Sequence, residues 1–420
     1  MFTRRAFFGL AAALAALPRR ARAADTAERR FLFVLARGGW DPTYVFTPGL
    51  DPATVDLDAE GEDAEVGGLA FRDAPTRPSV RSFLEKYGGQ TSFVNGLEVR
   101  SLTHERCRRL LFCGEGEGEA DDWPTLIAAA DARWRLPHLV LTGPSFTAAH
   151  GAAVVRLGQN NQLAELLSGR FVDRADRTLA VPSSAAAEAA RAFARGRAER
   201  WAAAQAGGQP AAFGEALLGA YDQLDLVRSN ADLLDMGLDV GTDRLVPVPV
   251  RVAAALQCFE AGYSRCALVE HLGLYDQTWD SHSSNSIQSA HFELLFSDLT
   301  AILDEMAARP GLGGGTLLDE TTVVVLSEMG RTPRLNAADG KDHWTFTSAM
   351  LLGAGVRGGT VVGGYDDALY GLPVDLGTGR PDDAGAALTP EHLGATLFAL
   401  AGLDPDTAGA EPITALLEDG

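Results

Sequence analysis

The chain has 420 residues, 46% of them hydrophobic, and carries 36 basic against 56 acidic side chains, a formal charge of −20. An acidic excess of this size repels a phosphate backbone and excludes nucleic acid as a partner. The length and apolar content are sufficient for one large α/β core.

The first 23 residues have the features of a signal peptide. Arg4 and Arg5 precede an apolar run from Phe7 to Leu17, and an Ala-Arg-Ala sequence ends at Ala23. This run is much shorter than the roughly 20 residues of a membrane-spanning helix. The paired arginines favour export by the twin-arginine translocase, with a general secretory signal as the alternative. We expect a periplasmic or secreted protein without a transmembrane segment, and its mature charge becomes −25 because five arginines are removed.

The mature chain, residues 24–420, alternates β-rich runs with helical patterns. Strands are expected within residues 29–41, 91–97, 265–272, 321–330, 348–355 and 360–364. Helices are expected over 104–112, 286–308 and 390–401. Residues 183–236 are rich in alanine with Arg and Glu at helical spacing, which predicts a helical insert or cap. Together these patterns predict a doubly wound, mostly parallel sheet flanked by helices.

The four cysteines are not arranged for a structural zinc site, because none belongs to a Cys-x-x-Cys pair. In an oxidising compartment Cys107 could pair with Cys113, and Cys258 with Cys266. Buried free thiols fit the sequence equally well.

Acidic and imidazole side chains follow several predicted strands at the points where those strands end. In doubly wound sheets, ligands bind outside the carboxyl ends of the strands. Carboxylates and imidazoles are ligands for zinc, manganese or calcium. We therefore predict a site for one or two divalent ions, with these candidate ligands: Asp41, Asp280, His282, Glu328, Asp342 and His343.

The spacing within two pairs supports this site. Asp280 and His282 are separated by one residue, so in extended chain both side chains point the same way and can share a cation. Asp342 and His343 are adjacent and face opposite ways, so that one can bind metal while the other binds a neighbouring ion or orients a ligand. Asp41, which follows two glycines, has the alternative role of a turn residue.

The segments RGGWD, WDSH, SEMGRTPRLN and GKDHW occur in this order. They resemble the domain-of-unknown-function 1501 family of exported proteins, which is similar to alkaline phosphatases and sulfatases. The resemblance spans nearly the whole mature chain, and SE-x-GRTP and DHW are its specific elements. It implies an alkaline-phosphatase-like fold and a metal-dependent hydrolase acting on a small or polymeric phosphate or sulfate ester. The alternative is a non-catalytic exported scaffold or maturation partner that retains the fold and one metal.

The resemblance also implies roles for individual residues. Asp41 resembles the first-strand carboxylate that binds one metal. Asp280 and His282 resemble the pair that holds the other metal, and His343 resembles the late histidine that completes it. Glu328 stands where many of these enzymes have Asp followed by His or Asn. Here Met329 follows, which removes one ligand of a two-zinc site.

The nucleophile of that superfamily is a Ser, Thr or modified Cys at a helix amino terminus, which matches Thr103, with Ser101 as second choice. A helix cap is the alternative role for Thr103. The neighbouring His104 either assists a metal or faces solvent, and the solvent-facing role is favoured. Cys107 lacks the Cys-x-Pro-x-Arg context of formylglycine sulfatases.

Arg331 is a candidate for binding the anionic oxygens of the substrate. Its alternative role is an ion pair with Glu328.

Overall fold

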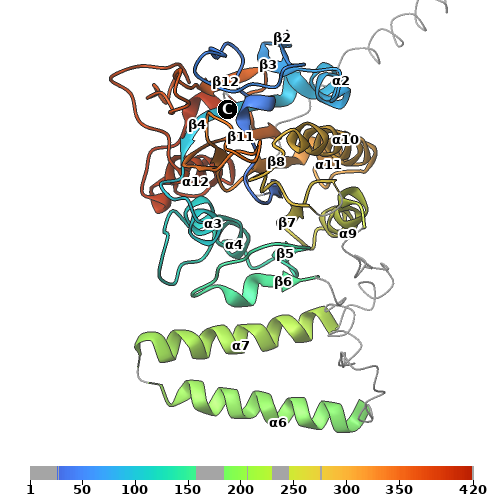
Figure 1. Ribbon diagram of the computed structural model, residues 1–420. Coiled ribbons are helices and arrows are strands. Elements are labelled where there is room, and N and C mark those ends of the chain that lie inside the picture. The colour runs from blue at the N-terminus through green and yellow to red at the C-terminus, as the bar shows by residue number, and fades with distance from the viewer. Residues whose placement is uncertain are drawn as a thin grey trace, which may run out of the picture.

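The computed structural model describes residues 26–157, 184–228 and 246–418, apart from residues 27, 206, 275 and 276. The predicted signal peptide lies outside the described residues. An 8-stranded sheet in the order β12-β4-β11-β8-β1-β7-β5-β6 forms the centre of the molecule (Figure 1). Its strands are β1 (Arg30–Ala36), β4 (Thr91–Glu98), β5 (His138–Val140), β6 (Val154–Arg156), β7 (Cys266–His271), β8 (Thr321–Leu326), β11 (Phe346–Gly353) and β12 (Thr360–Gly363).

One strand runs against the others. β11 is antiparallel to its neighbours β4 and β8, whereas the other neighbouring pairs of the described sheet are parallel. Phe346, at the start of β11, therefore lies beside Glu98, at the end of β4. The amino end of β11 thus meets the carboxyl ends of its neighbours at one edge of the sheet.

Helices cover both faces of the sheet, because successive side chains of each strand point to opposite sides. Leu32 and Val34 of β1 enter one core, and Phe31 and Phe33 enter the other. The first core includes α2 (Pro78–Tyr87), α9 (Val248–Glu260), α10 (Ile287–Ala308) and α11 (Leu317–Glu320). The second includes α3 (His104–Cys113), α4 (Trp123–Ala129) and α12 (Pro390–Leu400). The predicted fold class, a doubly wound and mostly parallel sheet between helices, is confirmed.

The segment predicted to be a helical insert or cap contains α6 (Ser184–Ala203) and α7 (Gly208–Arg228), which lie side by side beyond β6 in Figure 1. Arg195 of α6 pairs with Asp222 and Asp225 of α7, and Trp201 packs edge-on against Phe213. Within the predicted range 183–236, residues 183, 206 and 229–236 lie outside the described residues.

The smaller elements lie around the central sheet. β2 (Glu62–Val66) pairs with β3 (Leu69–Asp73), and β9 (Gly330–Arg331) pairs with β10 (His343–Trp344). The short 3-10 helices are η1 (Pro42–Tyr44), η2 (Gly88–Gln90), η3 (Gly151–Ala153), η5 (Pro405–Ala408) and η6 (Thr414–Leu416).

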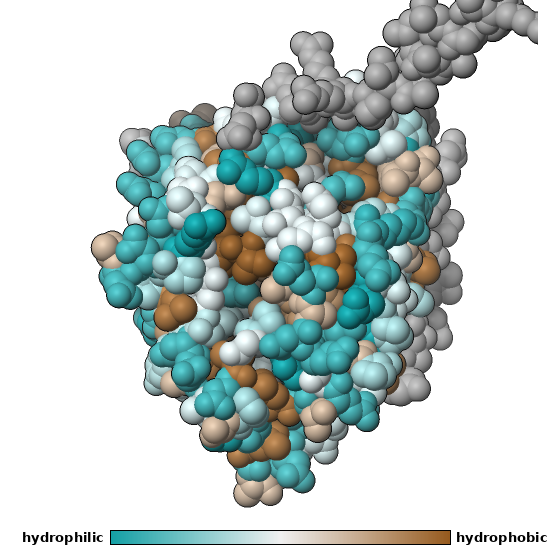
Figure 2. Space-filling model, turned by 90° about the horizontal axis from the view of Figure 1, so that it is seen from above, coloured by the Kyte–Doolittle hydropathy of each residue, from teal (hydrophilic) through white to brown (hydrophobic). Residues whose placement is uncertain are grey.

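Figure 2 shows the molecule from above relative to the view of Figure 1. This surface is mostly hydrophilic, and its apolar residues form small, separate patches. None of the helices in the described part of the chain combines the length and apolarity that a bilayer-spanning helix requires. The cysteines, for which disulfides and free thiols both fitted the sequence, are buried free thiols: Cys107, Cys113, Cys258 and Cys266.

Candidate metal centre

Four segments that are distant in the sequence meet at the carboxyl edge of the sheet. His104 is the first residue of α3, which follows β4, while Asp280 lies in the loop after β7. Glu328 comes directly after β8, and His343 in β10 precedes β11. The reversed direction of β11 brings His343 to the edge where the other three strands end. This is the edge at which doubly wound sheets bind ligands.

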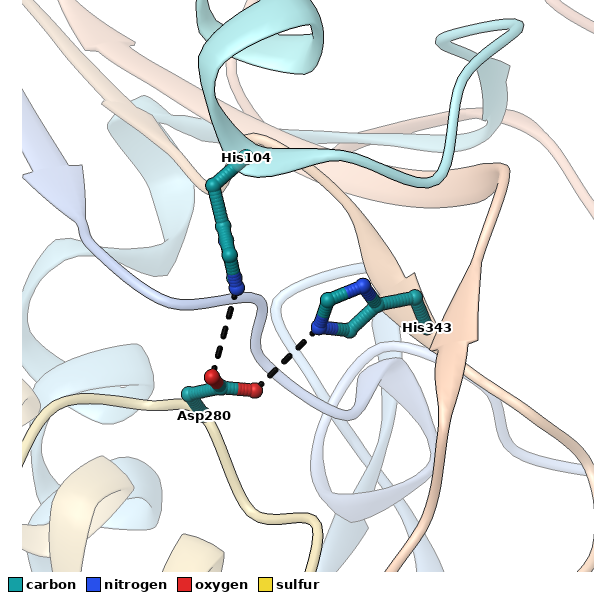
Figure 3. A group of neighbouring side chains, drawn as sticks. All are labelled: His104, Asp280 and His343. Carbon is teal, nitrogen blue, oxygen red and sulfur yellow. Dashed lines mark hydrogen bonds and ion pairs between the residues drawn. The ribbon is translucent and has the colours of Figure 1, made fainter.

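Three histidines surround the Asp280 carboxylate. His104 Nε2 lies 3.3 Å from Asp280 Oδ2, and His343 Nε2 lies 3.3 Å from Oδ1 (Figure 3). His282 Nε2 lies 3.2 Å from the same Oδ1 and 2.9 Å from His343 Nε2. The side chains of these four residues are between 19% and 46% exposed, so a small ion or substrate can reach them.

The second ring nitrogen of each histidine lies next to an oxygen. Nδ1 contacts an acceptor in all three cases: His104 meets Glu328 Oε1 at 3.0 Å, His282 meets Asp342 Oδ1 at 3.0 Å, and His343 meets the Leu102 carbonyl at 2.6 Å. A carbonyl or an ionised carboxylate can only accept, so we assign a proton to each Nδ1. A neutral imidazole in this tautomer presents the lone pair of Nε2 towards Asp280. Oxygen acceptors orient metal-binding histidines in the same way.

The charges of the site favour a cation at its centre. Hydrogen bonds to Asp280 and Glu328 raise the pKa of His104 to about 9. Burial alone would raise the pKa of Asp280, but hydrogen bonds from His104 and Arg331 outweigh it and hold this pKa below its usual range. The Asp280 carboxylate therefore stays negative, and without a metal ion His104 carries a second proton, on Nε2. A metal ion would displace this Nε2 proton.

The spacing of the donor atoms fits a divalent ion. Ligands at about 2.0–2.1 Å from a tetrahedral ion lie about 3.3 Å from one another. The nitrogen-to-oxygen distances around Asp280 are 3.2 and 3.3 Å. Donor atoms of His104, Asp280 and His343 all lie within 4.8 Å of one another. His282 lies outside this group, although its Nε2 is close to Asp280 and His343. Two imidazoles with one carboxylate form a donor set that suits zinc better than calcium, which prefers oxygen ligands.

Two glycines allow the loops of the site to approach each other. A Cβ on Gly38, whose φ is +122°, would lie 2.6 Å from the backbone nitrogen of Asp280. A Cβ on Gly340 would lie 2.0 Å from the carbonyl carbon of His282. Side chains at these positions would displace the loop that carries Asp280 and His282.

Asp41, a predicted metal ligand, lies outside the group of donor atoms around Asp280. Its carboxylate is fully buried and lies 2.8 Å from Lys341 Nζ, while accepting hydrogen bonds from Asn285 and Thr43. The ammonium group of Lys341 thus supplies the positive charge that a metal ion would bring. Asp41 also caps η1 by accepting from the backbone nitrogen of Thr43, as expected of a turn residue.

Arg331, predicted to bind the anionic oxygens of the substrate, contacts Asp280. Its side chain is fully buried, and it donates to the carbonyls of Gly38, Gly39 and Lys341. One further N–H group lies 2.7 Å from Asp280 Oδ1. A guanidinium enclosed in this way cannot reach the oxygens of a substrate, so Arg331 anchors Asp280 instead.

Two of the predicted ligands, Glu328 and Asp342, contact the outer nitrogens of histidines rather than the centre of the group. Glu328 is fully buried and also accepts from the backbone nitrogen of Gly38 at 3.0 Å. Asp342 contacts Nδ1 of His282, and His343 Nε2 lies near Asp280. Met329 is a fully buried core residue.

His104, for which the sequence favoured a solvent-facing role over assisting a metal, belongs to the group of donor atoms. The available signal was its place at the start of a helix that follows a strand, beside the candidate nucleophile Thr103. Thr103 is exposed at the N-cap position of α3, and its side chain makes no capping hydrogen bond. Its hydroxyl is therefore not committed to the helix.

These features define an α/β protein with a candidate divalent-metal centre at the carboxyl edge of its sheet. The family described as "Protein of unknown function (DUF1501)" matches residues 159–412. The chain belongs to this family. The matched segment includes Asp280, His282 and His343, whereas His104 lies before it. A comparison with curated proteins found no match.

Solved structures of low sequence identity cover most of the chain. The lipoteichoic acid synthase LtaP from Listeria monocytogenes is 9% identical, with 93% of this chain and 76% of that chain covered and a TM-score of 0.39. Ps i-CgsB in complex with a neocarrahexaose is 9% identical, with coverage of 92% and 75% and a TM-score of 0.39. A protein of the alkaline phosphatase superfamily from Vibrio parahaemolyticus is 10% identical, with coverage of 99% and 78% and a TM-score of 0.33. Similarities this weak assign no reaction to this chain.

Proposed function

We propose that this protein is an exported, divalent-metal-dependent hydrolase of phosphate or sulfate esters that works in the periplasm or outside the cell. The observation that carries the proposal is the convergence of three Nε2 atoms on the Asp280 carboxylate, each histidine being oriented through its Nδ1. The features of residues 1–23 support passage through the twin-arginine translocase, which carries folded proteins.

The residues proposed to hold one ion, with zinc as the best fit to the donors, are His104, Asp280, His282 and His343. A divalent ion bound there would stabilise negative charge on the ester oxygens. Glu328 and Asp342 keep two of the imidazoles in the productive tautomer. Arg331 fixes the Asp280 carboxylate.

Thr103 is proposed as the nucleophile. Its Oγ attacks the phosphorus or sulfur of the ester and loses its proton, and the bond to the leaving alcohol breaks as that alcohol takes up a proton. Water then hydrolyses the ester on Thr103 and releases inorganic phosphate or sulfate. The amino end of α3 favours negative charge next to this hydroxyl.

The alternative function, an exported scaffold or maturation partner with one metal and no turnover, also has a specific observation in its favour. Lys341 occupies the place beside Asp41 where a second ion would bind, and Arg331 is not available for substrate. Two features of a phosphatase-like site are therefore replaced by structural ion pairs.

Metal analysis tests the centre itself. Asp280→Ala and His282→Ala should each lower the metal content of the purified protein from about one ion per chain. His150→Ala is a matched control, because the side chains of His150 and His282 are both 46% exposed and both pair with an aspartate. Equal metal content in all four proteins would remove the basis of the proposal.

Hydrolysis of aryl phosphates, phosphodiesters and aryl sulfates tests the activity. Thr103→Ala should abolish turnover and keep the metal, whereas Ser101→Ala should retain turnover. A metal-loaded protein that hydrolyses none of these esters would favour the scaffold.

A further inference from the structure

A second pocket, which charged side chains line in part, lies at the same edge of the sheet as the candidate metal centre. It is open, has a volume of about 350 Å³, and lies between α3 and the ends of β1, β5 and β7. Arg37, Arg108 and Arg109 contribute three positive charges to its lining, and Glu105 and Glu270 contribute two negative ones. A local excess of positive charge is unusual in a chain of formal charge −20.

The pocket adjoins the metal centre through two connections. Arg108 and Arg109 follow His104 on α3 by about one helical turn, a rise of about 6 Å. Arg37 directly precedes Gly38, which packs against Asp280, and the Arg37 carbonyl accepts from Trp279 N at 2.9 Å. One molecule of modest size can therefore reach both places.

The arginines differ in how firmly they are held. Arg109 stacks over the ring of Phe146 at 5.0 Å and donates to the Gly118 carbonyl. Arg37 lies 3.6 Å from Glu270, and Arg108 lies 3.5 Å from the well exposed Glu105. Arg37 and Glu105 are well exposed, at 44% and 83%, whereas Glu270 and Arg108 are only 8% and 14% exposed. An incoming anion can bind to the two guanidinium groups from the exposed side while these pairs stay in place.

A glycine in the lining makes room for the carboxylate that pairs with Arg37. Gly143, whose φ is +107°, forms part of the lining, and a Cβ there would lie 2.8 Å from Cγ of Glu270. The absence of a side chain at Gly143 leaves Glu270 in place beneath Arg37. Guanidinium groups bind phosphate, sulfate and carboxylate through paired hydrogen bonds.

We infer that this pocket binds a second anionic group of the ester substrate, so that the substrate carries a phosphate, sulfate or carboxylate about one helical turn away from the ester that is cleaved. This inference rests on the proposed function, because only that function makes the bound molecule a substrate. It assigns Arg37 and Arg108 as the residues that select multiply charged esters over singly charged ones.

Calorimetric titration of the zinc-loaded protein with glucose 1,6-bisphosphate and glucose 6-phosphate tests this inference. The bisphosphate should bind at least tenfold more tightly, since it carries a second phosphate on the same sugar ring. The double variant Arg37→Ala/Arg108→Ala should lose this difference, while its affinity for glucose 6-phosphate changes less than threefold. Each charge-assisted hydrogen bond that is lost corresponds to about a tenfold change or more.

Two further variants guard against a misfolded double variant. Arg81→Ala is the matched control, because Arg81 is 39% exposed against 44% for Arg37 and also pairs with a carboxylate. It should bind both ligands as the wild type does. Glu105→Gln, at a well exposed position, should bind the bisphosphate several-fold more tightly because the competing carboxylate is removed.

The outcomes separate this inference from the proposed function. Equal binding of the two sugar phosphates by the wild type, or double-variant behaviour equal to that of Arg81→Ala, would overturn the pocket assignment even if esters are hydrolysed. Selective binding that depends on Arg37 and Arg108, without hydrolysis of any ester, would support an anion site and refute the hydrolase.

Discussion

Replacing Glu328 by glutamine should weaken metal binding without removing a ligand. Glu328 is fully buried and holds His104 through Nδ1 at 3.0 Å, so water cannot take over its role. Loss of such an orienting carboxylate costs about 10–100-fold in metal affinity, or about 1.4–2.8 kcal/mol. Asp342→Asn should have a smaller effect, because the side chain of Asp342 is 61% exposed and solvent can replace its contact with His282.

Competition between each variant and a chromophoric chelator for zinc measures this difference. Asp122→Asn is a suitable control, because Asp122 is also a buried carboxylate that accepts backbone N–H groups and lies 3.8 Å from a histidine, His138. This variant should keep the metal affinity of the wild type. The reasoning is refuted if Glu328→Gln folds normally and binds zinc as tightly as Asp122→Asn does.

Three further predictions concern stability and thiol chemistry. Lys341→Met removes the positive charge beside the buried carboxylate of Asp41 and should lower the free energy of unfolding, measured by urea denaturation, by about 3–5 kcal/mol. A loss below about 1 kcal/mol would contradict this prediction. Burial and the nearby His271 lower the pKa of His291 to about 4, against about 6.5 in the unfolded chain. The neutral His291 side chain therefore makes its full contribution to the free energy of unfolding above pH 6.5, and this contribution is lost as the pH falls towards 4. Over this pH range the free energy of unfolding of the wild type should fall by about 3 kcal/mol more than that of His291→Gln. Parallel pH profiles of the two proteins would contradict this prediction. A thiol-reactive dye should label no cysteine in the folded protein and all four in urea without reductant, whereas incomplete labelling in urea would indicate a disulfide.

Local sequence was sufficient to predict most of the elements around the site. The consecutive β-branched residues of β8 are typical of a strand buried on both faces, and all of β8 is buried. The spacing of Asp280 and His282 correctly placed both side chains on one side of the chain, since this follows from backbone periodicity alone. The same periodicity predicts opposite orientations for Asp342 and His343, but both side chains contact the imidazole ring of His282.

The partners of the charged residues were decided only by the tertiary structure. Asp41 and Lys341 are 300 positions apart, so the sequence could not show that an ammonium group rather than a metal ion lies beside this carboxylate. Arg331 is enclosed by backbone carbonyl groups of other loops, including those of Gly39 and Lys341. The sequence could not show these contacts, so it predicted a side chain free to bind substrate. His104 reaches the site because β4 ends at the edge where β11 begins, and this pairing depends on strand order and direction. The sequence by itself thus determined which side chains could bind a cation, and the packing of the sheet decided which of them meet.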